Sequence, residues 1–298
     1  MKDAGGCLAW EKTMDLGLTD KRVFVTGGSR GIGRAVAEGF VAEGARVAIC
    51  ARSAEAVEEV RQSLAAAGAA DVLGFVADVA STPDVKRCVT EIVECWGGVD
   101  VLVNNAGQSM VGGIEDIVPE DLLVHANTLQ VAHFRVAQAV VPYMRAQHWG
   151  RIIDINAVVG VNPAPAGIPA VINRAACVAL SRSLAMALGP DNILVNTLNM
   201  GWIETGQWEK RYAEIGEGVS RDEFFAMANK VVPLGRFGKP EDVVGMVLFL
   251  ASDRANYITG ASIDIAGGLG GQISYYPTMQ KEMRELSDAR LAAGKGRC

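Results

Sequence analysis

A glycine-rich segment near the start of the chain is the first place where residue types and spacing suggest chemistry. It follows an apolar run at 22–26, precedes a stretch of helical period, and comprises Gly27, Gly28, Ser29, Arg30, Gly31, Ile32 and Gly33. Glycines at a strand-to-helix turn let the backbone approach a pyrophosphate, which the positive N-terminus of the helix attracts. The segment therefore predicts a dinucleotide site.

The end of the second predicted strand, at 45–50, indicates which dinucleotide this turn accepts. An acidic side chain there would bind the adenosine ribose hydroxyls and repel a 2′-phosphate. This chain has Ala51 followed by Arg52, and Arg30 lies in the glycine turn. Because guanidinium groups favour phosphate, we predict a preference for NADP(H); the alternative is that either arginine is simply solvated.

The elements that must position these residues alternate along the chain. Apolar runs of strand length lie at 22–26, 45–50, 72–76, 151–155, 193–198 and 262–265, and a further strand ends at 102–103. Helical patterns are predicted between them at about 30–43, 54–67, 84–95, 119–147, 175–188 and 240–251. Such alternation is typical of a parallel sheet covered by helices on both faces. We predict an α/β, Rossmann-type, doubly wound single domain over 20–270, with a long insertion at about 202–238 after the sixth strand. A leader at 1–19 and a C-terminal extension at 271–298 lie outside the pattern.

Composition excludes several classes of partner. Half of the residues are hydrophobic and 21% are charged, so a packed core is expected, while the net charge of -6 argues against nucleic acid and anionic lipid. No apolar run of about 18 residues and no signal peptide is evident, which favours a cytoplasmic protein with no membrane partner. The six cysteines and three histidines lack the spacing of metal ligands, so no metal site is expected.

Further motifs follow the later strands. Asp78-Val79 follows the third, Asn104-Asn105-Ala106-Gly107 the fourth, and Gly201, Ile203 and Thr205 the sixth. With the glycine turn, these motifs resemble the short-chain dehydrogenase/reductase family over about 18–268, in the pattern of bacterial 3-oxoacyl-carrier-protein reductases. The resemblance implies that Asp78-Val79 contacts adenine. It also implies that Asn105, Ala106 and Gly107 border the cofactor, and that the segment from Gly201 to Thr205 holds the nicotinamide carboxamide, although Met200 replaces the usual proline.

The same resemblance locates the family's proton-transfer residues. In the family, tyrosine transfers the proton of the carbonyl oxygen, serine orients that oxygen, lysine binds the nicotinamide ribose, and asparagine anchors a water. Here Ala157 falls on the serine, Ala170 on the tyrosine and Arg174 on the lysine, while Asn127 matches the asparagine. Alanine cannot donate a proton, and arginine is a poor acid at neutral pH. We therefore expect impaired ketone reduction, with Asn127 and Arg174 as the remaining catalytic candidates.

Three functions stay open at this point. The first is an NADP(H)-dependent oxidoreductase that transfers hydride to an already activated acceptor, such as an iminium, which needs no tyrosine. The second is a non-redox lyase, hydrolase or cyclase that keeps NADP as a scaffold, and the third is a non-catalytic binding or regulatory subunit. Retention of Asn105, Ile203 and Thr205 favours the first, because the family uses these residues at the nicotinamide end of the cofactor.

Residues that could contact a small-molecule substrate follow the fourth strand and lie in the insertion at about 202–238, which the resemblance identifies as a helical substrate lid. Gln108 and Ser109 are predicted to border the substrate, and Trp202 and Trp208 favour an apolar or aromatic one. The alternative is that the lid aromatics form the lid's own small core. His125 is interpreted as a structural histidine. Tyr275 and Tyr276 could reach a neighbouring subunit's site, since the resemblance implies a homodimer or homotetramer.

Overall fold

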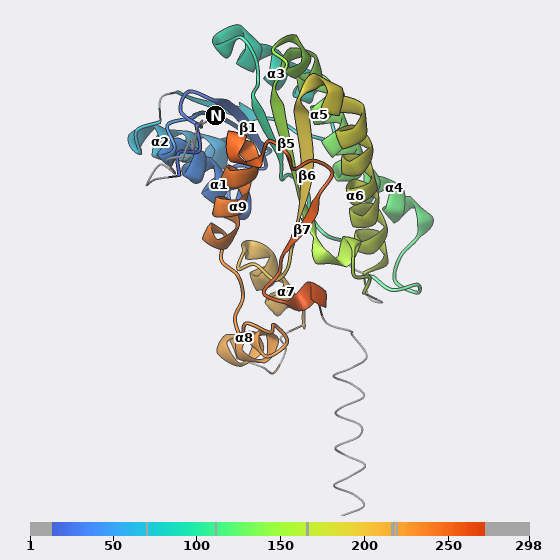
Figure 1. Ribbon diagram of the computed structural model, residues 1–298. Coiled ribbons are helices and arrows are strands. Elements are labelled where there is room, and N and C mark those ends of the chain that lie inside the picture. Colours follow the sequence, from blue (N-terminus) through green and yellow to red (C-terminus); the bar gives the residue numbers. More distant parts are fainter. Residues whose placement is uncertain are drawn as a thin grey trace, which may run out of the picture.

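A seven-stranded parallel sheet forms the centre of the molecule (Figure 1). The computed structural model describes residues 14–69, 71–110, 112–164, 167–215, 218 and 220–271. Within them the strand order is β3-β2-β1-β4-β5-β6-β7. The strands are β1 (Arg22–Thr26), β2 (Arg46–Ala51), β3 (Val72–Val76), β4 (Val101–Asn104), β5 (Gly150–Ala157), β6 (Ile193–Met200) and β7 (Ser262–Ile265). The order reverses between β1 and β4, where doubly wound sheets bind their ligands.

Helices cover both faces of this sheet, as predicted (Figure 1). They are α1 (Gly31–Ala42), α2 (Ala54–Ala66), α3 (Thr82–Trp96), α4 (Pro119–Thr128), α5 (Gln130–Ala146), α6 (Ile168–Leu188), α7 (Gly206–Ile215), α8 (Arg221–Asn229) and α9 (Glu241–Ala251). Alternate residues of one strand serve the two faces: Val23 and Val25 pack with α1 and α9, whereas Phe24 packs on the α3 and α5 side. Burial on both faces explains why the strands read as continuous apolar runs.

Two helix boundaries differ from the sequence prediction and bear on the site. The predicted helix over 119–147 is interrupted at Leu129, whose backbone has φ −123° and ψ −93°, so α4 and α5 are separate. The helix predicted to begin at about Ala175 begins at Ile168 instead. Ala170 and Arg174 therefore both lie within α6.

Helix α6 is also notable for its length and apolar composition. Among the described residues, Ile168–Asp191 is the one segment long and apolar enough, by length and composition, to cross a membrane. One face of the helix packs against β5 and β6, where Cys177, Val178 and Ala185 are buried, while Ile172 and Met186 are exposed.

Most of the predicted leader and C-terminal extension, including Tyr275 and Tyr276, lies outside the described residues. Leu18, at the end of the predicted leader, is buried in the core beside β1.

Candidate active site

The glycine turn between β1 and α1 has no room for side chains. Gly27 and Gly31 have φ of +67° and +54°, the left-handed region that favours glycine. A Cβ on Gly33 would lie 2.3 Å from the carbonyl oxygen of Gly27, and one on Gly28 would lie 2.6 Å from Cγ2 of Ile49. In the described part of the chain, no side chain caps the N-terminus of α1. The turn therefore leaves backbone and helix end open to an anionic ligand.

Thr26 and Asn105 fix this turn against the end of β4. The Thr26 hydroxyl oxygen accepts hydrogen bonds from the backbone N–H groups of Asn105 and Ala106, both at 3.0 Å. The Asn105 amide donates to the carbonyl oxygens of Thr26 at 3.0 Å and Gly27 at 3.1 Å. Asn105 thus holds the turn in place through protein contacts. Thr26 directly precedes the glycine turn in sequence, and the structure adds the role of its hydroxyl as the acceptor that joins the turn to β4.

The segment after β6 returns to the glycine turn. A Cβ on Gly31 would lie 3.4 Å from Cγ2 of Thr205, an ordinary van der Waals contact. Ile203 is buried, and a Cβ on Gly201 would lie 2.6 Å from Cα of Ala266, so this segment packs closely on the chain after β7. The structure therefore brings together the phosphate turn and the segment predicted to hold the carboxamide.

Arg30 and Arg52 are exposed near the end of β2. Neither side chain forms a hydrogen bond or an ion pair with another residue in the described part of the chain. In contrast, the neighbouring Arg34 is held by Glu38 and Glu59, both at 2.9 Å. Arg30 and Arg52 are therefore free to bind a phosphate.

The structure does not bring Asn127 to the positions of the missing proton donors. Asn127 is exposed, and its side-chain oxygen accepts a hydrogen bond of 2.8 Å from Arg135. The same guanidinium donates to the Val79 carbonyl at 2.6 Å and to the Thr82 hydroxyl at 2.9 Å. Asn127 is thus connected to the Asp78-Val79 turn. A sequence motif alone could not reveal this, because the break in the helix changes which residue faces the site.

Leu129 occupies that break instead. It is fully buried, and its Cδ1 lies 2.7 Å from where a Cβ on Gly107 would be. Leucine offers no hydrogen bond there, so this region of the site is apolar where the sequence predicted a polar amide.

The three replaced positions do lie near one another. Ala157 ends β5, and Ala170 and Arg174 lie one helical turn apart on α6. Asn156 donates to the Arg174 carbonyl at 3.1 Å, and the Arg174 guanidinium donates through Nη1 to the Ile155 carbonyl at 3.1 Å. Ala170 is buried, so the protein itself fills the space beside this alanine.

His125 is a satisfied structural histidine, which confirms the interpretation from sequence. Its Nε2 lies 2.7 Å from the Gln108 carbonyl oxygen, and its Nδ1 lies 3.0 Å from the Asn173 amide nitrogen. Asn173 also donates to the Pro169 carbonyl at 2.9 Å. His125 therefore fixes the chain at Gln108, whose side chain is exposed, and Ser109 is half-buried beside it.

A buried polar network underlies the ends of β4 and β5. The Asp154 carboxylate accepts a hydrogen bond of 2.9 Å from Asn104 and a further one from the Ser181 hydroxyl, and lies 3.5 Å from Nδ1 of His133. Burial lowers the pKa of His133, and the Asp154 charge opposes that shift only in part. His133 and Ser181 were missed by the sequence reasoning, because both sit within apolar helical patterns that carried no signal.

The lid aromatics pack mainly on one another. The ring centroids of Trp202 and Trp208 are 4.9 Å apart, and those of Trp208 and Phe237 are 4.8 Å apart. Phe225 joins them, with its centroid 5.4 Å from that of Phe237. These contacts fit the alternative that the aromatic residues form the lid's own core.

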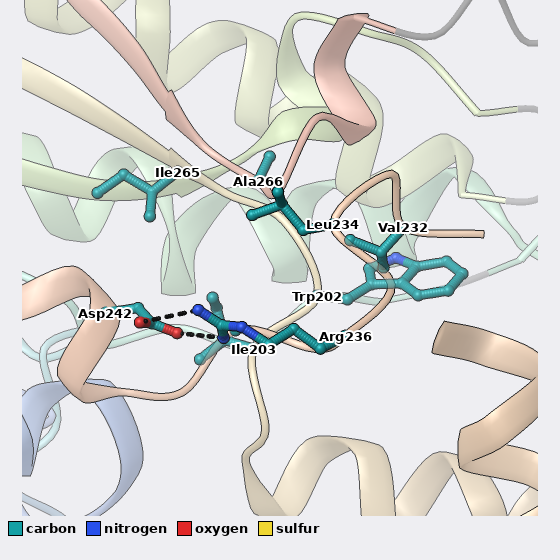
Figure 2. A pocket seen from close by; sticks show the side chains of 10 residues that line it. Trp202, Ile203, Val232, Leu234, Arg236, Asp242, Ile265 and Ala266 are labelled. Atoms are coloured by element: carbon teal, nitrogen blue, oxygen red, sulfur yellow. Dashed lines mark hydrogen bonds and ion pairs between the residues drawn. The ribbon is translucent and has the colours of Figure 1, made fainter. Parts of the chain in front are cut away.

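A cavity of about 210 Å³ lies between this lid and the end of β7. Its lining includes Trp202, Ile203, Leu234 and Ala266, with Arg236 reaching across to Asp242 in an ion pair of 2.7 Å (Figure 2). Neither of the two alanine positions nor Gln108 lines it. No cluster of potential metal ligands occurs among the described residues.

Comparison with known proteins accounts for this geometry. The family model described as enoyl-(acyl carrier protein) reductase matches residues 27–270. The 3-oxoacyl-(acyl-carrier-protein) reductase FabG of Aquifex aeolicus is 34% identical over 259 residues, which are 86% of this chain and 100% of that protein. L-Sorbose reductase from Gluconobacter frateurii, solved with NADPH and L-sorbose, has a TM-score of 0.84 at 33% identity, covering 87% of this chain and 100% of that one. A short-chain type dehydrogenase/reductase from Mycobacterium marinum has a TM-score of 0.78 at 32% identity, covering 86% and 98%. The chain therefore belongs to the short-chain dehydrogenase/reductase family.

Proposed function

We propose that this protein is an NADP(H)-dependent oxidoreductase that acts on a small apolar or aromatic molecule. It does so without the family's serine, tyrosine and lysine. The observation that carries the proposal is a contrast within one site. The glycine turn lies close to Thr205, since a Cβ added to Gly31 would lie 3.4 Å from Cγ2 of Thr205, while alanine stands at 157 and 170.

The residues present fit NADP(H). The Gly33 and Gly28 positions leave no space for a Cβ, so the backbone of the turn can lie close to a pyrophosphate. Arg30 and Arg52 would bind the 2′-phosphate, and the segment from Gly201 to Thr205 would hold the carboxamide. Two of the relatives' solved structures support this assignment, since L-sorbose reductase and a variant of actinorhodin polyketide ketoreductase were both solved with NADPH.

When bound, NADPH supplies a hydride, and the chain's own residues decide which acceptor can take it. A ketone needs a proton donor at the oxygen that becomes a hydroxyl. Ala157 and Ala170 cannot donate one, and His125 is committed to the Gln108 carbonyl and Asn173. An iminium needs no proton, because the hydride neutralises a cation. We therefore propose an iminium or a similarly activated group as the acceptor.

Matched acceptors test the proposal. Purified protein is mixed with NADPH and either a cyclic iminium or the ketone of the same ring, and loss of NADPH absorbance is followed. We expect oxidation of NADPH by the iminium at a rate at least about 100-fold above that by the ketone, the usual contribution of a general acid. Ketone reduction at an equal rate would reject the missing-donor argument.

A non-redox reaction is the second candidate, because alanine stands at both 157 and 170, where the family has its proton-transfer residues. It predicts tight NADPH binding with no oxidation by any acceptor, while another substrate is converted and the cofactor is recovered unchanged. The same assay with product analysis separates the two candidates. A protein that neither oxidises NADPH nor converts a substrate would instead fit a binding subunit.

We also propose a homodimer or homotetramer. Large apolar side chains are exposed on α4, α5 and α6, namely Leu123, Val124, Val131, Phe134, Ile172 and Met186. Exposed apolar side chains on adjacent helices are typical of an interface. Light scattering should give a multiple of the chain mass, and Phe134→Glu should reduce it. A wild-type monomer would reject this assembly.

A further inference from the structure

Arg174 is a buried cation, and two of its three guanidinium nitrogen atoms have no hydrogen-bond partner among the described residues. Its side chain is 8% exposed, and its one hydrogen bond to a described residue runs from Nη1 to the Ile155 carbonyl. Nε is completely buried and has no partner among the described residues. Nη2 also has no hydrogen bond to them, but it is not among the completely buried atoms, so solvent can reach it. A buried polar group without a partner is unfavourable, and a buried charge more so.

None of the described ionisable groups near Arg174 forms an ion pair or a hydrogen bond with Nε or Nη2 of its guanidinium. Asp154 is the acidic residue of this buried region, but its oxygens accept from Asn104 and Ser181, and it makes no ion pair with Arg174. Burial lowers the pKa of His133 and raises the pKa of Cys177 to about 12, so both are neutral near pH 7. Arginine itself stays charged, although burial also lowers its pKa.

The unused atoms define the geometry of the missing partner. Nε and Nη2 form one edge of the guanidinium, and such an edge matches the two oxygens of a carboxylate. The Ile155 carbonyl bound by Nη1 lies two residues before Ala157, so the guanidinium lies at the carboxyl end of β5. Ligands of doubly wound sheets bind beyond that end.

We propose that Arg174 binds a carboxylate of the substrate, which makes the substrate an apolar or aromatic molecule with one anionic group. This inference rests on the proposed function, because it places the anion on the molecule that exchanges hydride with NADP(H). A cation at this position of the family binds the ribose hydroxyls of the cofactor, but these neutral groups do not neutralise the charge of Arg174. Nη2, which is not completely buried, makes the contact with the carboxylate.

A matched pair of probes tests the charge requirement. Phenylacetate and phenylacetamide share a ring and a size but differ in charge, and calorimetric titration measures both against protein saturated with NADP⁺. We expect phenylacetate to bind at least about tenfold more tightly, the value of one charged hydrogen bond. Equal affinities would overturn the proposal.

Variants then assign the preference to Arg174. Arg174→Met should remove the tenfold preference, and Arg174→Lys should retain part of it through the charge. Arg182→Met is the matched control, since Arg182 is an exposed arginine on the same helix and should leave the preference unchanged. A preference that survives Arg174→Met would overturn the assignment.

A stability readout separates ligand binding from a structural role. Arg174→Met removes an unpaired buried charge, so the ligand-free variant should melt about 2–4 °C higher than the wild type. A purely structural arginine predicts a lower melting temperature instead and would count against the proposal. Failure of the proposed function is distinguishable, because a protein that binds no NADPH would still be titrated with both probes in its cofactor-free form.

Discussion

The site has two regions, one around β1 and β4 and one around β5 and α6, and they differ in how completely their residues are packed and hydrogen-bonded. Around β1 and β4 the chain is tightly fixed, because glycines exclude Cβ atoms and Thr26 and Asn105 tie the turn to β4. Around β5 and α6, alanines stand where donors are expected, and Arg174 keeps an Nε without a partner among the described residues. The difference teaches that cofactor geometry and acid–base chemistry are separable in this fold, since they depend on different strands.

We expect the largest effect on NADPH binding from a substitution that places a side chain inside the glycine turn. Gly33→Val would put side-chain atoms where even a Cβ lies 2.3 Å from the Gly27 carbonyl oxygen. We expect NADPH binding to be lost in a fluorescence titration. Gly245→Ala is the control, because no described atom lies within 4 Å of its added Cβ, and it should bind NADPH normally. Normal binding by Gly33→Val would mean that the tight turn is not required.

A smaller effect should distinguish the two nicotinamide dinucleotides. Arg52→Ala removes a guanidinium without an ion-pair partner in the described chain, near the end of β2. It should weaken NADPH binding about tenfold, while NADH binding is unchanged. Arg61→Ala is a fair control, since Glu58 already holds that guanidinium at 2.7 Å. Equal loss for both dinucleotides would remove the phosphate argument for Arg52.

The buried polar network of His133, Asp154 and Ser181 should make the free energy of unfolding depend on pH. The pKa of His133 is lowered in the folded protein, so the unfolded state takes up a proton first as the pH falls below about 6.5. The stability that the neutral ring contributes is present above that pH and decreases below it, by at most about 1.4 kcal/mol per pH unit. Urea unfolding between pH 7 and pH 5 measures the slope, with His133→Leu expected to flatten it. An unchanged slope in that variant would assign the pH dependence elsewhere.

The smallest effect is expected at Asn127. Its contact with Arg135 is on the surface, so Asn127→Ala should cost less than about 1 kcal/mol of unfolding free energy and keep most of the NADPH oxidation rate. Arg135→Met removes the donor to the Val79 carbonyl as well and should weaken NADPH binding more. A severe loss of turnover in Asn127→Ala would restore the catalytic role expected from its motif.

The sequence predicted the cofactor half better than the catalytic half. Glycine spacing, strand ends and Arg52 are local signals, because a turn and the residues beside it follow from a few adjacent positions. The role of Asn127 depends on the break at Leu129, and the packing of Trp202 on Trp208 depends on how the lid folds. Both are decided by contacts between segments that are distant in the chain.

By itself, the sequence determined the alternation of strands and helices, the dinucleotide turn and the absence of the family's tyrosine and serine. These follow from period, residue type and register, each of which is written along the chain. Only the tertiary structure decided that His133, Asp154 and Ser181 meet beneath the strand ends, and that Arg174 is buried without a carboxylate partner among the described residues. The physical reason is that burial and pairing of charges depend on which segments pack together.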